Sequence, residues 1–75
     1  MKRKRVVLGK RYILTYFVGD DGDDISECIK FRSVLEDLDI VLLLFNRLVN
    51  RDDVQLAMIH VEDGAYHYLL RRWRP

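Results

Sequence analysis

The chain has 75 residues, of which 49% are hydrophobic and 33% are charged, and its formal net charge is +1. A chain of this length forms one domain and lies near the lower size limit for burying a self-sufficient core. The single cysteine, Cys28, excludes an intramolecular disulfide and a multi-cysteine metal site. The apolar runs are too short to span a bilayer, so we expect no membrane insertion.

The start of the chain is strongly basic and contains no acid. Six of the 13 basic residues lie here, namely Lys2, Arg3, Lys4, Arg5, Lys10 and Arg11. We expect residues 1–5 to form a flexible basic arm and residues 6–75 to form a single domain. Only three apolar residues follow the basic start before the next glycine, which is too few for a signal peptide, so we predict a cytoplasmic protein.

Two strands are predicted in the first half of the chain. Residues 11–18, RYILTYFV, are rich in β-branched and aromatic residues, which favour a strand. Six turn-forming residues, 19–24, end this strand. In residues 25–32, ISECIKFR, mainly apolar side chains alternate with mainly polar ones, which predicts a half-buried strand that is antiparallel to the first. Cys28 is expected to be a small buried hydrophobe within it.

A helix is predicted over residues 34–49. Ser33 and Glu36 have the spacing of a capping box, in which each side chain accepts a hydrogen bond from the backbone N–H of the other residue. Asn50 is expected to end the helix in a left-handed conformation. The apolar residues fill one half of the helix, which we expect to cover one face of a sheet.

Residues 54–73, VQLAMIHVEDGAYHYLLRRW, predict a β-hairpin around Asp63-Gly64. Two registers are compatible with the sequence. A two-residue turn would pair His60 with His67, whereas a three-residue loop with Gly64 in a bulge would slip the pairing by one residue. In both registers each face of the hairpin carries at least four large apolar side chains.

Together these elements predict an α+β domain with the order ββαββ. The simplest arrangement is a four-stranded, largely antiparallel sheet with one helix packed on one face. The helix then leaves the second apolar face of the sheet uncovered. An exposed apolar patch on the order of several hundred Å² usually marks an interface, so we expect this face to need a partner.

The sequence contains little that indicates catalysis or metal binding. The acidic run 20–24 lacks the spacing of an EF-hand and is expected to be a plain turn. His60 and His67 make a poor metal site because no third ligand is placed by the sequence. Nothing places Cys28 beside either histidine as a catalytic dyad. We therefore expect a non-enzymatic protein with no metal and no cofactor.

These observations favour a small interaction protein of the inhibitor or accessory-regulator type. We expect a homodimer that docks on a protein or nucleoprotein partner through the uncovered sheet face and the basic C-terminal tail. The predicted partner-binding residues are Leu69, Arg71, Arg72, Trp73 and Arg74. A dimer contact or second contact is predicted at Ile40 and Leu43, on the far half of the helix, and at His67.

The alternative is direct binding of nucleic acid. The tail interleaves arginines with Trp73, and stacking on strand aromatics combined with phosphate contacts is one way in which sheets hold single strands. The other contacts would come from the basic residues of the N-terminal segment: Lys2, Arg3, Lys4, Arg5, Lys10 and Arg11. In the simplest topology the two basic ends lie at opposite ends of the sheet.

Overall fold

A computed structural model describes residues 9–75 of the chain. The predicted basic arm, with Lys2, Arg3, Lys4 and Arg5, lies outside the described residues. The elements follow in chain order as β1 (Arg11–Val18), a 3-10 turn (Ile25–Glu27), β2 (Ile29–Leu35), α1 (Leu38–Val49), β3 (Val54–Asp63) and β4 (Tyr66–Trp73).

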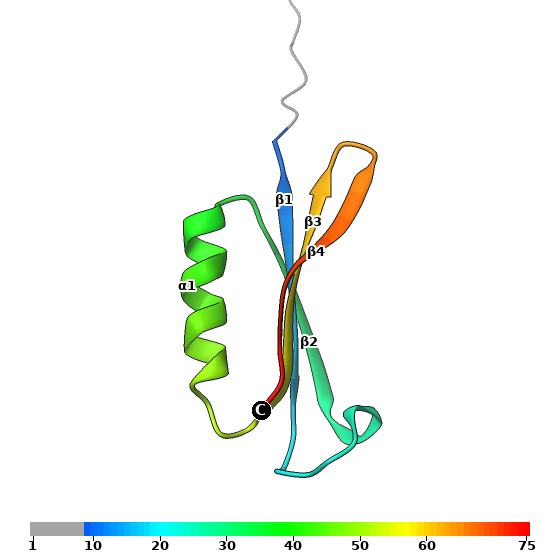
Figure 1. The fold of residues 1–75 in the computed structure, drawn as a ribbon, viewed down its shortest axis with the longest axis vertical. Coiled ribbons are helices and arrows are strands. Elements are labelled where there is room, and N and C mark those ends of the chain that lie inside the picture. The colour runs from blue at the N-terminus through cyan, green and yellow to red at the C-terminus, as the bar shows by residue number, and fades with distance from the viewer. Residues whose placement is uncertain (1–8) are drawn as a thin grey trace, which may run out of the picture.

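The four strands form one sheet with the order β2-β1-β3-β4, and all neighbouring strands are antiparallel. Figure 1 shows α1 lying along one side of this sheet, with no element on the opposite side. The predicted α+β fold and its ββαββ order are confirmed. We call the face covered by α1 the helix side and the opposite face the outer face.

The core lies between α1 and the two central strands, β1 and β3. The buried residues of the helix are Val41, Phe45 and Leu48, whose spacing of three and four residues places them on one stripe. Their partners in the core are Tyr12, Leu14, Val54, Ala57, Ile59 and Val61. Ile40 and Leu43 are 47% and 51% exposed, so their predicted place on the far half of the helix is confirmed.

The helix begins later than predicted. Ser33 lies in β2 opposite Leu14 of β1, and no capping box forms with Glu36. Asp37 caps the helix instead, because its Oδ1 accepts hydrogen bonds from the backbone N–H of residues 39 and 40, at 2.9 and 3.2 Å. Pairing of β2 with β1 as far as Leu35 keeps the backbone extended, and this prevents the earlier start. Asn50 does end the helix, but with a φ of −93° rather than a left-handed conformation.

The second strand also begins later than predicted. Residues 25–27 form a 3-10 turn, which the Glu27 carboxylate supports by accepting a hydrogen bond from the backbone N–H of Asp24 at 3.0 Å. The strand itself, β2, is almost fully exposed rather than half-buried. It is an edge strand, and α1 lies mainly over the two central strands, so little of the core reaches it.

The β3–β4 hairpin adopts neither predicted register. Asp63 pairs with Tyr66, so the turn consists of Gly64 and Ala65, one position beyond the expected Asp63-Gly64. Gly64 has a φ of +60°, as the first central residue of a type II′ turn requires. A bulge at Leu70 then shifts the register for the rest of β4.

Candidate interface on the uncovered sheet face

The centre of the outer face is an apolar floor on the two central strands. The floor consists of Ile13, Thr15 and Phe17 from β1 and of Leu56 and Met58 from β3. These residues share a face because alternate residues of a strand point to the same side and direct partners across strands do so as well. None of the five belongs to the core cluster beneath the helix.

The side chains of the floor are less exposed than the sequence predicts. Ile13, Thr15 and Leu56 are only 9%, 6% and 8% exposed, although no element covers them. Phe17 and Met58 are half-buried. The large hydrophobic residues of the outer face that remain well exposed lie on its edge strands, as Val34 and Leu69. The outer face therefore exposes less apolar surface than expected, because three of the five floor residues are shielded.

Three basic residues stand around the floor. One row across the sheet runs from Arg32 through Thr15 and Met58 to Arg72, so an arginine stands at each edge. Lys30 lies in the next row, opposite Phe17. Within residues 9–75, none of these three cations forms an ion pair. We call Lys30, Arg32 and Arg72 the rim cations.

The charge of the outer face is opposite in sign to that of the rest of the described domain. Residues 9–75 carry nine basic and 12 acidic residues, a net charge of −3. Among the residues paired in the strands, the outer face has the three rim cations and Arg11 against one acid, Glu62, which is a net charge of +3; Glu36 lies just beyond the end of β2, near Arg11. Such segregation determines which partners a surface attracts, and here it favours an anionic one.

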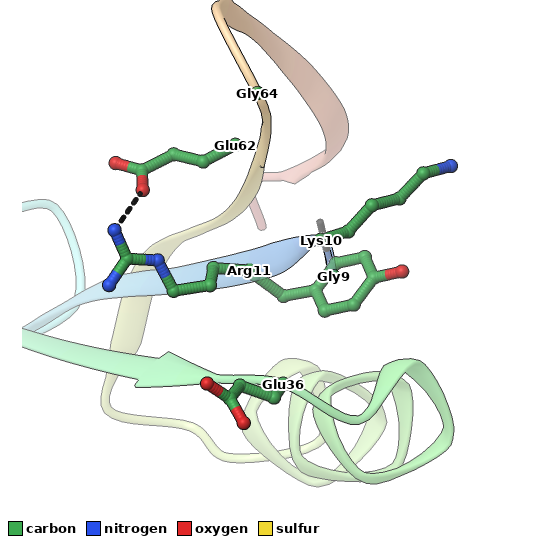
Figure 2. Close-up of a pocket in the computed structure, with 7 residues that line it drawn as sticks. Gly9, Lys10, Arg11, Glu36, Glu62 and Gly64 are labelled. Carbon is green, nitrogen blue, oxygen red and sulfur yellow. Dashed lines mark ion pairs between the residues drawn. The ribbon is translucent and has the colours of Figure 1, made fainter. Parts of the chain in front are cut away.

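At the hairpin end of the outer face the positive charge is matched locally. Arg11 Nη2 lies 3.3 Å from Glu62 Oε1, and His67 Nδ1 lies 4.0 Å from the other oxygen of the same carboxylate. Lys10 Nζ is 3.9 Å from Asp63 Oδ2. Figure 2 shows Arg11 turned toward Glu62 in the open hollow beside the hairpin. The cations at this end are therefore less available to bind an anion from another molecule than the rim cations are.

The predicted partner-binding residues do not share one surface. Leu69 and Arg72 lie on the outer face, opposite His60 and Met58. The bulge at Leu70 reverses the alternation between them, so that Arg71 and Trp73 lie on the helix side, opposite Ile59 and Ala57. Arg74 follows β4 at the end of the sheet, in a hollow that it shares with the acidic turn after β1.

The predicted second contact is divided as well. His67 lies on the outer face opposite Glu62, whereas Ile40 and Leu43 lie on the exposed side of α1. His60 is opposite Leu69, so the two histidines do not face each other across the hairpin. In the part of the chain that the structure describes, no group of three or more potential ligand side chains could hold a metal ion.

Cys28 is not arranged as a nucleophile. Desolvation, followed by the nearby carboxylate of Asp23, raises the pKa of its thiol, which keeps the thiol protonated at neutral pH. Its Sγ lies 3.5 Å from the backbone oxygen of Asp24. Cys28 precedes β2 at the end of the sheet that is opposite to His67, so the structure does not bring a thiol and an imidazole together.

The α1–β3 connection is hydrogen-bonded to the end of the sheet that lies away from the β3–β4 turn. The Arg51 guanidinium donates from Nε and Nη2 to the two carboxylate oxygens of Asp53, at 2.9 and 2.7 Å. These hydrogen bonds lower the pKa of Asp53 and raise that of Arg51. The backbone N–H of Gly19 donates to the Asp53 carbonyl at 2.9 Å, which fastens the end of β1 to this connection.

No family model, no curated protein and no solved structure matches the chain. Among the described residues, no helix has the length and apolar character needed to cross a membrane.

Sequence reasoning missed three residues of the outer face. Phe17, Lys30 and Arg32 come from the first two strands, whereas the predicted contacts came from the last strand and the chain ends. The alternation in residues 29–35 does place Lys30 and Arg32 on one face. Their grouping around Phe17, and with Arg72, depends on the strand order and on the bulge in β4, which no local pattern reveals.

Proposed function

We propose that this protein is a non-catalytic binding protein, of the inhibitor or accessory-regulator type, that docks on an anionic partner through its outer face. The observation that carries the proposal is the reversal of charge: a face with a net charge of +3 on a described domain with a net charge of −3. A cytoplasmic location remains a prediction of the sequence.

The rim cations support this function because they are unpaired among the described residues and surround an apolar floor. A cation that lies beside apolar surface and has no carboxylate partner is placed to meet an anion from another molecule. Complementary charge mainly raises the encounter rate and the selectivity of such docking. The floor adds apolar contact once water is displaced.

The contact surface proposed here differs from the C-terminal surface predicted by the sequence. Arg72 and Leu69 stay in it, and Phe17, Lys30 and Arg32 join it. Arg71 and Trp73 leave it, because they lie on the helix side. The non-catalytic character is supported by Cys28, whose raised pKa and distant position do not suit a nucleophile.

The test compares two double variants that change the net charge equally. Arg32→Glu/Arg72→Glu reverses charge at both ends of one row of the outer face. Arg47→Glu/Arg71→Glu makes the same change on α1 and on the helix side of β4. The readout is the salt concentration at which each protein elutes from immobilised heparin, a polyanion.

We expect Arg32→Glu/Arg72→Glu to elute at far lower salt than the wild type, and Arg47→Glu/Arg71→Glu to elute close to it. Circular dichroism and urea unfolding would confirm that both variants fold. Equal losses of retention in the two variants would contradict the proposed function, since the binding would then follow overall charge and not the outer face.

A further inference from the structure

We propose that the anionic partner is a single-stranded nucleic acid, whose bases lie on the apolar floor and whose phosphates contact the rim cations. The proposal rests on the proposed function and specifies its partner. It differs from binding by the N-terminal segment and the Arg/Trp tail, because the contacts here are Phe17, Lys30, Arg32 and Arg72 on one face of the sheet.

The shape of the floor favours flat bases over protein side chains. Interfaces between proteins draw most of their energy from anchor side chains that enter pockets. The best-formed hollows of the described residues are lined by residues at the two ends of the sheet. None of them includes a floor residue. The floor residues that remain accessible are the half-buried Phe17 and Met58, on which a planar base can stack without an anchoring pocket.

Phe17 gives the floor an aromatic ring for stacking. It lies on the central strand β1, is half-buried, and has Lys30 on one side and Leu56 on the other. Sheets that bind single strands stack bases on aromatic side chains and hold the phosphates with neighbouring cations. The stacked pair Tyr16 and Phe31 lies on the helix side, so it does not contribute to this surface.

The rim cations are spaced for a chain that crosses the sheet from one edge strand to the other. Lys30 and Arg32 are two residues apart on β2, which separates them by roughly 7 Å on the same face. Arg72 stands on the opposite edge strand, roughly 14 Å away across three strand spacings. A backbone that meets Lys30 and Arg32 on β2 and then crosses the sheet to Arg72 on β4 would contact all three rim cations, while its bases lie over Phe17 and Met58.

Duplex nucleic acid suits this domain poorly. Reading a duplex groove requires a basic helix or ribbon that protrudes into it. Here the hairpin tip carries Glu62 and Asp63, and the first turn of α1 carries Asp37 and Asp39. The hairpin tip and the helix start therefore bear acids, whereas the rim cations lie on the outer face of the sheet. That combination favours unpaired bases.

Fluorescence anisotropy with labelled twelve-nucleotide RNA and DNA strands of mixed sequence tests the inference, with the corresponding duplexes as competitors. Three phosphate contacts predict that the logarithm of the single-strand affinity falls with the logarithm of salt with a slope of about −2. Arg72→Gln should flatten this slope by about 0.7, the contribution of one phosphate. Arg71→Gln, the matched change on the helix side, should leave it unchanged.

The stacking contact is tested by Phe17→Leu, which keeps the apolar volume but removes the aromatic ring. We expect this variant to weaken single-strand binding roughly 5- to 100-fold, the range found for the loss of one base–aromatic stack. Phe31→Leu is the matched control on the helix side and should bind as the wild type does. A Phe17→Trp variant in a Trp73→Phe background should show fluorescence quenching when the single strand binds.

Each result separates this inference from the proposed function. Heparin retention that depends on the rim cations, without single-strand binding, would overturn the inference and leave an acidic protein surface as the partner. Equal binding of single strand and duplex, with Phe17→Leu unchanged, would also overturn it, since only charge would then be recognised. If substitution of the rim cations changes neither heparin retention nor single-strand binding, both proposals fail.

Discussion

Gly19 is the residue at which the end of β1 is held to the rest of the molecule. Its backbone N–H donates to the Asp53 carbonyl at 2.9 Å, and its own carbonyl accepts from Nε2 of the buried Gln55 at 3.3 Å. A Cβ atom at this position would lie 2.7 Å from the Sγ of Cys28 and 2.9 Å from an oxygen of Asp23. Both atoms end side chains, so an alanine here would require the Cys28 thiol and the Asp23 carboxylate to shift, and that carboxylate accepts a hydrogen bond from the backbone N–H of Asp20 at 2.7 Å.

We predict that Gly19→Ala lowers the free energy of unfolding by about 1 kcal/mol, because the added methyl group displaces the Cys28 thiol and the Asp23 carboxylate with its hydrogen bond to Asp20. Urea unfolding monitored by circular dichroism measures this change. Adding Cys28→Ala removes the closer of the two contacts and should restore part of the loss. If Gly19→Ala is as stable as the wild type, or if Cys28→Ala gives no rescue, this account of the contact is wrong.

At the level of elements, the start of α1 shows how pairing between strands overrides a local signal. Ser33 and Glu36 have the sequence of a capping box, but Ser33 is held in β2 opposite Leu14. The helix can begin only after the last residue of the strand, and Asp37 then supplies the cap. A capping motif describes about four residues, whereas the extent of β2 is set by β1, which lies far away in the sequence.

We predict that Asp37→Ala destabilises the domain by about 1 kcal/mol through loss of the helix cap. Ser33→Ala should change the free energy of unfolding by no more than about 0.5 kcal/mol, as for an ordinary exposed position. Urea unfolding of the two variants distinguishes the observed cap from the predicted one. A larger loss for Ser33→Ala than for Asp37→Ala would mean that the helix begins earlier in solution.

For the whole molecule, the sequence predicts the order of elements but not the composition of its surfaces. Alternation and composition suffice for β1, for the existence of α1 and for the C-terminal hairpin. The two turn geometries considered for that hairpin both place Arg71 and Trp73 with Leu69. The bulge at Leu70 separates them, and the apolar alternation of the strand does not mark this extra residue. The rim cations therefore emerge only once the register is known.

The distribution of exposed apolar side chains bears on the predicted homodimer. Of the nine exposed large hydrophobic residues, four lie on the helix side of the sheet, three lie on α1, and only Val34 and Leu69 lie on the outer face. Two outer faces packed together would oppose two surfaces with a net charge of +3 each, which like-charge repulsion disfavours. Self-association is therefore better served by the exposed side of α1, where Ile40 and Leu43 lie.

Sedimentation equilibrium in the micromolar range tests this arrangement with two matched leucines. Leu43 on α1 and Leu69 on the outer face are 51% and 49% exposed, so replacing either removes a similar apolar surface. We predict a wild-type dimer that Leu43→Glu converts to a monomer and that Leu69→Glu leaves intact. Both substitutions are at exposed positions and should not prevent folding. The reverse pattern would assign the dimer to the outer face, and a monomeric wild type would show that the homodimer prediction is wrong.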